Sequence, residues 1–186
     1  MKPIESKNTR EQPNDDNYLS RIVAISNIGT QPAFMYQGEM TKPDPRWEIT
    51  YELVTTNMND GRPFWVSEEV PSKIGSKKLA SRYMAANVAE GSDAKDLLNK
   101  PVMVATKKDA KGYAKVTSVA GVPSGLPVPE LRNPTHLFDM FDENLDLDLY
   151  NSFSDFKKSK FTRADDFEKS SLYKALSESA TDDIPF

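Results

Sequence analysis

The sequence predicts a mainly β domain with one internal helix and an acidic, partly helical tail. This prediction depends on short runs of β-branched and aromatic residues between turn signals, on one segment of helical periodicity among them, and on a change of charge after Thr135. A length of 186 residues suits one domain of about 100–150 residues with appendages. We therefore expect one folded body flanked by two tails.

Residues 1–17 are polar and charged and contain two prolines, so we expect a disordered amino-terminal arm. From residue 18 the composition changes, because residues 18–29 and 33–40 are rich in β-branched and aromatic side chains. The turn signal GTQP lies between these runs, which predicts either two strands or one strand bent at Gly29.

The clearest strand is RWEITYELVT, residues 46–55, in which large apolar and polar side chains alternate. One face carries Trp47, Ile49, Tyr51 and Leu53, and the other carries Arg46, Glu48, Thr50 and Glu52. An Asp-Gly turn follows, and residues 62–70 are the predicted returning strand of a hairpin.

Residues 76–90 have helical periodicity, and Gly91 is the expected stop. The apolar face of this helix carries Leu79, Tyr83, Ala86 and Val88. Residues 100–108 and 112–122 then form a second predicted hairpin around the turn DAKG. The expected order is three strands, one helix and two strands.

Residues 123–181 are predicted as a separate carboxyl-terminal extension. Its first part contains four prolines and has little room for regular structure, whereas residues 137–153 alternate acids with large apolar residues. Over residues 162–180, Thr162 is a candidate helix cap, and Phe167, Leu172 and Leu176 have near-helical spacing.

Charge is distributed unevenly along the chain. Up to Thr135 there are 18 basic and 16 acidic residues, a net +2, and after it 6 basic and 12 acidic residues, a net −6. The chain has no cysteine, which excludes disulfides, thiolate catalysis and cysteine-based zinc sites, and its single histidine, His136, excludes a multi-histidine metal site. No window approaches the ~20 apolar residues of a membrane span, so we expect a soluble cytoplasmic protein.

Sequence patterns for catalysis and metal binding are weak. The segment DENLDLD, from Asp142, places oxygen-bearing side chains at alternate positions, but Leu147 replaces the glycine of a calcium loop and no suitable glutamate follows. The acidic pairs Glu68/Glu69 and Asp165/Asp166 lack an apolar setting that would separate their pKa values. We expect no enzyme activity, no metal and no cofactor.

The predicted order over residues 18–122, with a long first strand bent at Gly29, resembles the oligonucleotide/oligosaccharide-binding (OB) barrel, a five-stranded, partly open Greek key with one helix between strands 3 and 4. Single-strand binding by such a barrel requires aromatic side chains with basic neighbours. The candidate DNA-binding residues are Tyr36, Lys42, Arg46, Trp47, Arg62, Phe64, Trp65, Lys107, Lys108, Lys111, Tyr113 and Lys115.

Alternatives stay open for several of these residues. Trp47 shares its face with Ile49 and Leu53, so it is either a core residue or a stacking platform. Phe64 and Trp65 are adjacent in a strand and point opposite ways, so one of them should be outside. The lysines at 107, 108 and 111 flank a turn and fit an ordinary solvated loop equally well.

Residues 182–186, DDIPF, resemble the carboxyl-terminal tip with which bacterial and phage single-stranded DNA-binding proteins dock onto replication and repair enzymes. The resemblance implies that Ile184 and Phe186 fill an apolar pocket, Pro185 limits the entropy lost, and Asp182 and Asp183 meet a basic rim. The acidic, aromatic approach to the tip favours the phage proteins over the cellular ones. The competing hypothesis is an acidic inhibitor whose segment FDMFDENLDLDLY mimics nucleic acid charge.

Overall fold

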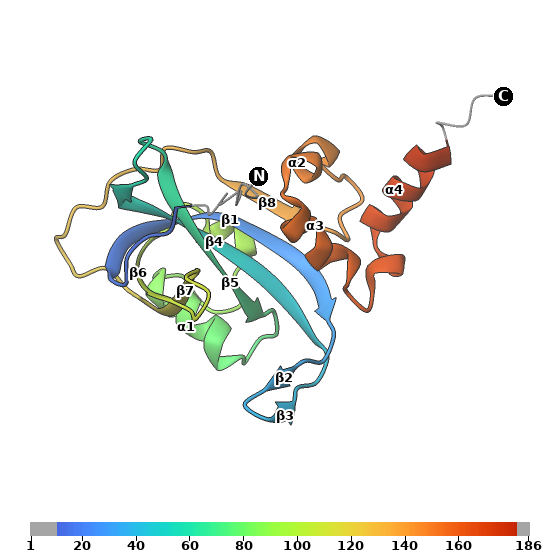
Figure 1. Ribbon diagram of the computed structural model, residues 1–186, viewed down its shortest axis with the longest axis horizontal. Coiled ribbons are helices and arrows are strands. Elements are labelled where there is room, and N and C mark those ends of the chain that lie inside the picture. The colour runs from blue at the N-terminus through green and yellow to red at the C-terminus, as the bar shows by residue number, and fades with distance from the viewer. Residues whose placement is uncertain (1–10, 182–186) are drawn as a thin grey trace, which may run out of the picture.

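The computed structural model describes residues 11–181 and is mainly β, with a curved antiparallel sheet and four short helices (Figure 1). The strands are β1 (Asn17–Gln31), β2 (Met35–Tyr36), β3 (Glu39–Met40), β4 (Asp44–Asn57), β5 (Pro63–Pro71), β6 (Pro101–Lys108), β7 (Ala114–Ala120) and β8 (His136–Asp139). The helices are α1 (Lys77–Ala85), α2 (Leu147–Ser152), α3 (Asp155–Thr162) and α4 (Ser171–Thr181), with 3-10 turns at Ala94–Leu97 and Phe167–Lys169. The predicted class and the predicted order of the main strands are confirmed.

The main sheet has the order β5-β4-β1-β6-β7, and β8 pairs with β1 in parallel. Its long central strand β1 pairs with β6 near its start and with β4 along most of its length. Residues of β5 and β7 lie near each other, but no hydrogen-bonded ladder joins these two strands. The sheet is therefore open, and not the clearly closed five-stranded barrel that would remove both edges.

Gly29 bends β1 without ending it. Its φ of +71° and the register shift between Asn27 and Thr30 keep the strand paired through a bend, as a glycine bulge does. The second predicted run shrinks to the β2–β3 hairpin, whose turn residues Gln37 and Gly38 both have positive φ. The first run is therefore one long strand bent at Gly29, and the second run is a separate hairpin that does not continue it.

Helix α1 is shorter than predicted at its carboxyl end. Ser76, the first residue of the predicted range, caps its start by accepting a hydrogen bond from the Leu79 amide. The helix ends at Ala85 because Asn87 adopts a left-handed φ of +53°, and the amide of Val88 then donates to the carbonyl of Tyr83. Asn87 is therefore the stop, and the prediction of Gly91 was wrong.

The first hydrophobic cluster lies between the concave face of the sheet and α1 (Figure 1). Ile49, Tyr51 and Leu53 are fully buried in it, which confirms the alternation predicted for β4. The polar face of β4 is buried as well, because residues 130–134 and α3 cover it: Glu52 accepts hydrogen bonds from the Arg132 amide and the Asn133 side chain.

The second hydrophobic cluster belongs to the carboxyl-terminal extension. It contains Ile28, Phe138, Met140, Tyr150, Phe161, Ala164 and Leu172. Most apolar residues of the acidic segment therefore pack in or against this cluster, although Leu137 and Phe141 are exposed. The extension is a packed unit at one end of β1. Thr162 is the last residue of α3, and α4 starts at Ser171, so the prediction of Thr162 as a helix cap was wrong.

The folded body begins earlier than expected. The Thr106 amide donates to the Asp16 carbonyl, the Lys108 amide to Asp15 Oδ1, and the Ala114 amide to Gln12 Oε1. Residues 11–17 of the predicted arm are thus attached to β6 and β7, and residues 1–10 lie outside the described part of the chain. Within residues 11–181, no helix is both long and apolar enough to cross a membrane.

Candidate nucleic-acid interface

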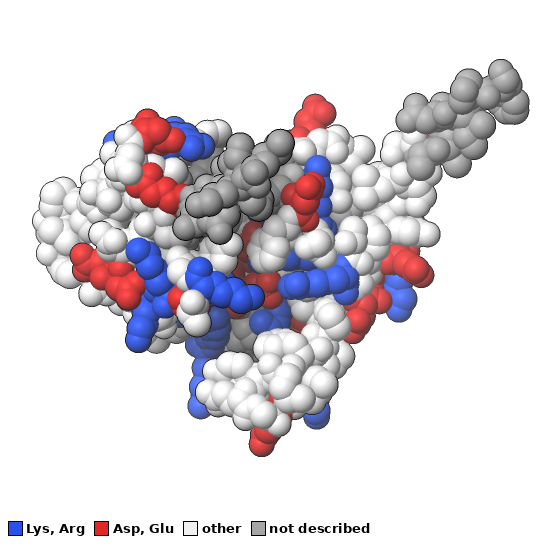
Figure 2. Space-filling view, in the orientation of Figure 1, with Lys and Arg blue, Asp and Glu red and all other residues white. Residues whose placement is uncertain are grey.

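A groove of about 880 Å³ lies over the outer face of β4 and β5 and continues past β5 toward β7, where Phe64, Val66 and Glu68 also line it. Thr50, Ser67 and Trp65 line its sheet side, Phe153 and Phe156 line it from the extension, and residues 114–116 of β7 line it from a third direction. Figure 2 shows Lys and Arg side chains in a band across the middle of this face of the molecule, with acidic side chains between them. Strands far apart in sequence therefore share one polar and aromatic depression.

Two carboxylates at the base of the groove are held by four cations. Lys157 Nζ lies 3.1 Å from Glu48 Oε1, and Lys160 Nζ bonds to Glu48 Oε2 and lies 3.1 Å from Glu69. Arg163 lies 3.3 Å and Arg46 lies 4.0 Å from the same Glu69 carboxylate. Because four cations share two carboxylates, this ionic cluster carries two excess positive charges at neutral pH.

Burial by itself raises the pKa of the Glu48 carboxyl, whose side chain is only 5% exposed, but Lys157 and Lys160 outweigh that effect and hold the pKa below its ordinary value. Glu48 is therefore ionised at neutral pH and does not release its cations by taking up a proton. The cluster fixes α3 against β4 and keeps positive charge beside the groove.

Trp65 is the predicted aromatic residue that the structure presents most directly to the groove. Its side chain is 36% exposed, and its Nε1–H donates to Glu52 Oε2 at 3.0 Å. The hydrogen bond fixes one edge of the indole, which remains partly open to the groove. Lys115 also lines the groove, where its ammonium lies 3.8 Å from Asp109.

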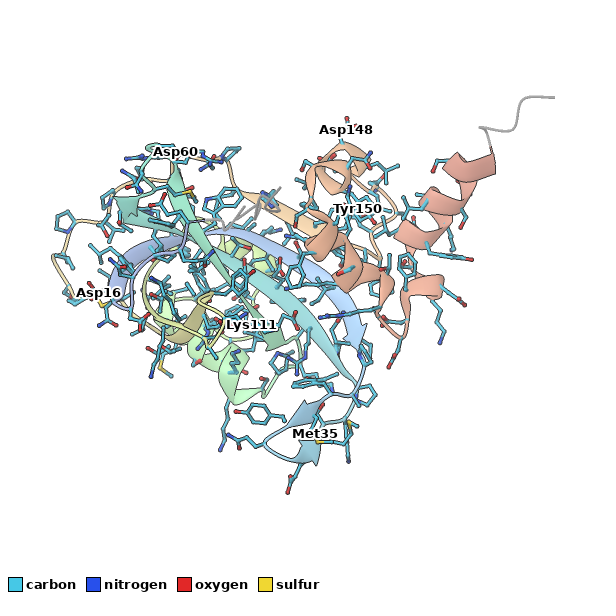
Figure 3. The ribbon with its side chains drawn as sticks, viewed as in Figure 1. Asp16, Met35, Asp60, Lys111, Asp148 and Tyr150 are labelled. Carbon is cyan, nitrogen blue, oxygen red and sulfur yellow. The ribbon has the colours of Figure 1, made fainter. Side chains whose placement is uncertain are left out.

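Predicted residues also lie on two exposed projections of the body. Tyr36 is exposed on the β2–β3 hairpin, Lys42 follows it, and the Arg46 guanidinium lies 5.3 Å from the Phe34 ring centroid at the base of the hairpin. The turn between β6 and β7 exposes Lys107, Lys108, Lys111 and Tyr113. Figure 3 shows Met35 on the hairpin and Lys111 on the turn.

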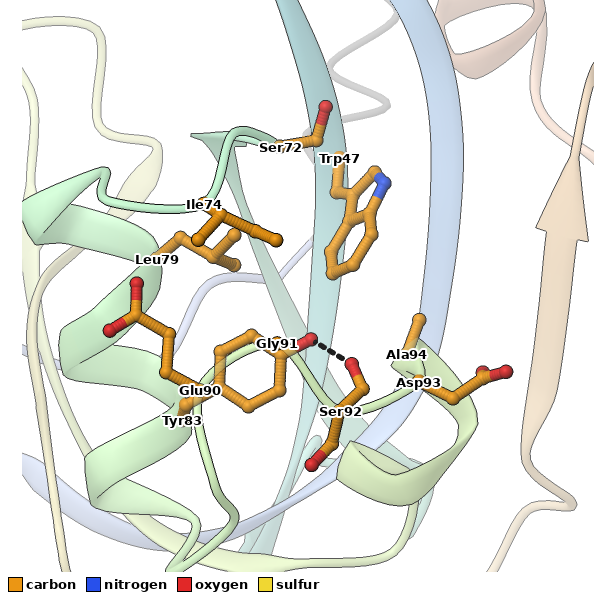
Figure 4. Close-up of a pocket in the computed structure, with 10 residues that line it drawn as sticks. All are labelled: Trp47, Ser72, Ile74, Leu79, Tyr83, Glu90, Gly91, Ser92, Asp93 and Ala94. Atoms are coloured by element: carbon orange, nitrogen blue, oxygen red, sulfur yellow. Dashed lines mark hydrogen bonds between the residues drawn. The ribbon is translucent and has the colours of Figure 1, made fainter.

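Phe64 also lines the groove, but its side chain is only 5% exposed and packs in the first cluster on the inner face of β5. Two predicted residues lie elsewhere. Trp47 is half-buried and lines a separate hollow of about 270 Å³ beside Tyr83 (Figure 4). Arg62 is exposed in the turn before β5, 2.6 Å from the Asp60 carboxylate.

The sequence interpretation missed the contribution of α3. Phe156, Lys157 and Lys160 line the groove from this helix, and Arg163 follows at its end. A signal was present, because four of the six basic residues of the acidic tail fall within residues 157–163. Their sequence, KKSKFTR, is a basic island in an otherwise acidic segment.

Glu68 also differs from its prediction. Its carboxylate is buried, accepts a hydrogen bond from Tyr51 Oη at 2.8 Å and binds Arg82 Nε at 2.7 Å. Glu69 is more exposed and pairs with α3, so the two neighbours do have different settings. Both are used in ion pairs that join elements of the fold.

No group of three or more metal-binding side chains occurs among residues 11–181. His136 is partly buried beside Phe153, and burial together with nearby Lys157 lowers its pKa. The predicted partner-binding tip, residues 182–186, lies outside the described residues. No protein-family model, curated protein or solved structure matches this chain.

Proposed function

We propose that the chain binds single-stranded DNA without sequence preference, through the groove over β4 and β5. The strand pairing supports an OB-type barrel as the framework, since β1 lies between β4 and β6 and the helix falls between the third and fourth of the five long strands. In this proposal the gap between β5 and β7 is the open part of the barrel.

The observation that carries the proposal is the exposed Trp65 ring beside an ionic cluster with excess positive charge. An aromatic face stacks on any base, and cations attract the phosphates that link the bases, so together they bind a strand whatever its sequence. Lysines 107, 108 and 111 and Lys42 extend the positive charge onto the flanking projections.

A second part of the proposal concerns partners. We propose that residues 182–186 recruit proteins of DNA replication, recombination or repair, in a bacteriophage setting. Support comes from the resemblance of DDIPF to the tips of single-stranded DNA-binding proteins and from the acidic residues and apolar anchors that such docking requires.

The alternative of an acidic nucleic-acid mimic has less support. Within the acidic segment, Asp146 caps α2 by accepting from the Leu149 amide, and Asp139 accepts from the Asn27 side chain. Met140 and Tyr150 of this segment are buried in the second cluster, whereas Phe141 is exposed. These acids therefore have local structural roles, and they are confined to one unit of the molecule.

Titration of fluorescent oligo-dT tests the proposal, with Trp65→Ala as the informative variant. Loss of the stacking face should weaken binding by ~1–3 kcal/mol with the fold intact. Trp47→Ala is the matched control: it should lower the free energy of unfolding, because Trp47 packs against the first cluster, and leave affinity unchanged. Unchanged affinity in folded Trp65→Ala protein would remove this groove from the proposed function.

Salt and strandedness give an independent check of the same proposal. The logarithm of the binding constant should fall by roughly 0.7 per neutralised phosphate for each unit of log salt concentration. Duplex DNA should bind much more weakly, because its bases are already stacked on each other. Equal affinity for single-stranded and duplex DNA would contradict base stacking as the binding mechanism.

A further inference from the structure

We propose that Phe156, in the carboxyl-terminal extension, is a second base-stacking residue of the groove, so that unpaired bases bind between the sheet and α3. This inference rests on the proposed function and adds a wall of the site that lies outside the five-stranded body. Phe156 and Trp65 line the same groove, one from α3 and the other from β5.

The exposure of Phe156 is not explained by folding of the extension. Phe138, Tyr150, Phe153 and Phe161 pack against one another with ring centroids 5.2–6.2 Å apart. Phe156 stands apart from these rings and is 71% exposed, with the Lys160 ammonium 5.1 Å from its centroid. A single exposed apolar ring is ordinary on a protein surface, but Phe156 is distinguished by its place in the groove that Trp65 also lines.

Helix α3 is fixed, so the ring has a defined position before any ligand arrives. Ser154 caps its start by accepting from the Lys157 amide, and Lys157 and Lys160 bind Glu48 of β4. Gln31 Nε2 donates to the Lys160 carbonyl at 2.9 Å, which ties the end of the helix to β1. A stacking residue on such a support binds with little loss of backbone entropy.

The chemistry of the two walls defines the ligand as a strand with accessible base faces. Trp65 and Phe156 offer aromatic surface without a base-specific hydrogen-bonding pattern, and the ionic cluster beside them attracts phosphate. A duplex presents only its edges and its terminal base pairs, so it cannot place successive bases against these rings. Single-stranded DNA with unstacked bases, such as oligo-dT, fits best.

Phe156→Ala tests the inference against Phe141→Ala, a matched control. Phe141 is also an exposed phenylalanine of the extension, but it does not line the groove. In titrations of labelled oligo-dT, Phe156→Ala should bind roughly 5- to 150-fold more weakly, and Phe141→Ala should bind like the wild type. Circular dichroism should show the wild-type spectrum for both variants.

A second variant reports on position as well as affinity. When oligo-dT saturates the protein, Phe156→Trp should lose more tryptophan fluorescence than the wild type, whose Trp65 already contacts bases, whereas the indole added in Phe141→Trp should not be quenched. If Trp65→Ala weakens binding while Phe156→Ala binds like the wild type and the indole at position 156 is not quenched, the inference is overturned and the proposed function stands. Absence of saturable binding by the wild type overturns both.

Discussion

The two hydrophobic clusters of the protein are assembled from different kinds of sequence. In the first cluster, apolar residues recur at every second position of long strands, as Ile49, Tyr51 and Leu53 do. In the second cluster, residues from β8, α2, α3 and α4 meet Ile28 of β1 at irregular spacing. Regular strands bring the first set together, whereas a chain that folds back onto β1 brings the second set together.

Strand β1 joins the two regions. Ile22 and Ile25 belong to the first cluster, and Ile28 on the same strand belongs to the second. The ion pairs of Glu48 and Glu69 with α3 form a second connection. We therefore expect the two clusters to unfold as one cooperative unit, although only the first was apparent in the sequence.

The largest expected effect comes from Phe161→Ala in the second cluster. Phe161 is fully buried, and its ring lies 5.2 Å from that of Phe138 and 6.0 Å from that of Phe153. Its loss should lower the free energy of unfolding by about 3–5 kcal/mol. Urea unfolding followed by circular dichroism and by tryptophan fluorescence should give one shifted transition, because both clusters share β1.

Leu53→Ala is the first-cluster counterpart, with an expected loss of about 2–5 kcal/mol. Leu53→Ala should shift the urea transitions seen by circular dichroism and by tryptophan fluorescence to the same extent. If Phe161→Ala shifts the circular dichroism signal but leaves the tryptophan transition in place, the two regions unfold independently and their proposed coupling is wrong.

Gly29→Ala, at the bend of β1 between the two clusters, should lower the free energy of unfolding by a smaller amount. A β-carbon at Gly29 would lie 2.5 Å from Asp166 Oδ1 and 2.9 Å from Met140 Sδ, at a φ of +71°. Overpacking and backbone strain together should cost about 2–3 kcal/mol. Gly38→Ala is the control for φ alone, since it has φ +85° and no atom within 4 Å of the added carbon; equal losses in the two variants would show that packing at Gly29 has no role.

The smallest expected effect is the pH dependence of the ionic cluster. Burial raises the pKa of Glu48, but Lys157 and Lys160 outweigh it, so the folded value is below the unfolded one. The resulting stability is fully present above the unfolded value of about 4.3 and is lost as pH falls through the folded value. Urea unfolding at pH 7, 5 and 3 should show a decline mainly below pH 5, and Glu48→Gln should make that decline shallower.

Patterns between near neighbours in sequence predicted most of the strands and turns of the five-stranded body. Alternation in β4 and the Asp-Gly turn depend on near neighbours in sequence, so they could be predicted without the fold. The end of α1 was predicted incorrectly because both Asn87 and Gly91 adopt positive φ, and only the chain geometry decides which of them ends the helix.

The candidate site was predictable only in part. Alternation along the strand predicted that either Phe64 or Trp65 points outward, but not which one. The apolar neighbours of Trp47 did not decide whether it belongs to the core or to the binding site. Which residues share a groove depends on contacts between β5, β7 and α3, and these elements are up to about a hundred residues apart. Phe156 was missed for that reason, since nothing near it in sequence relates it to Trp65.

Side-chain type and short-range spacing were enough to predict the mainly β class, the order of the main strands and the contrast between a nearly neutral body and an acidic tail. Three features depend on the folded arrangement: the polar face of β4 is covered, Glu48 and Glu69 neutralise part of a basic helix, and the extension supplies one wall of the groove. Burial and ion pairing arise between surfaces, and the chain must fold back on itself before those surfaces meet.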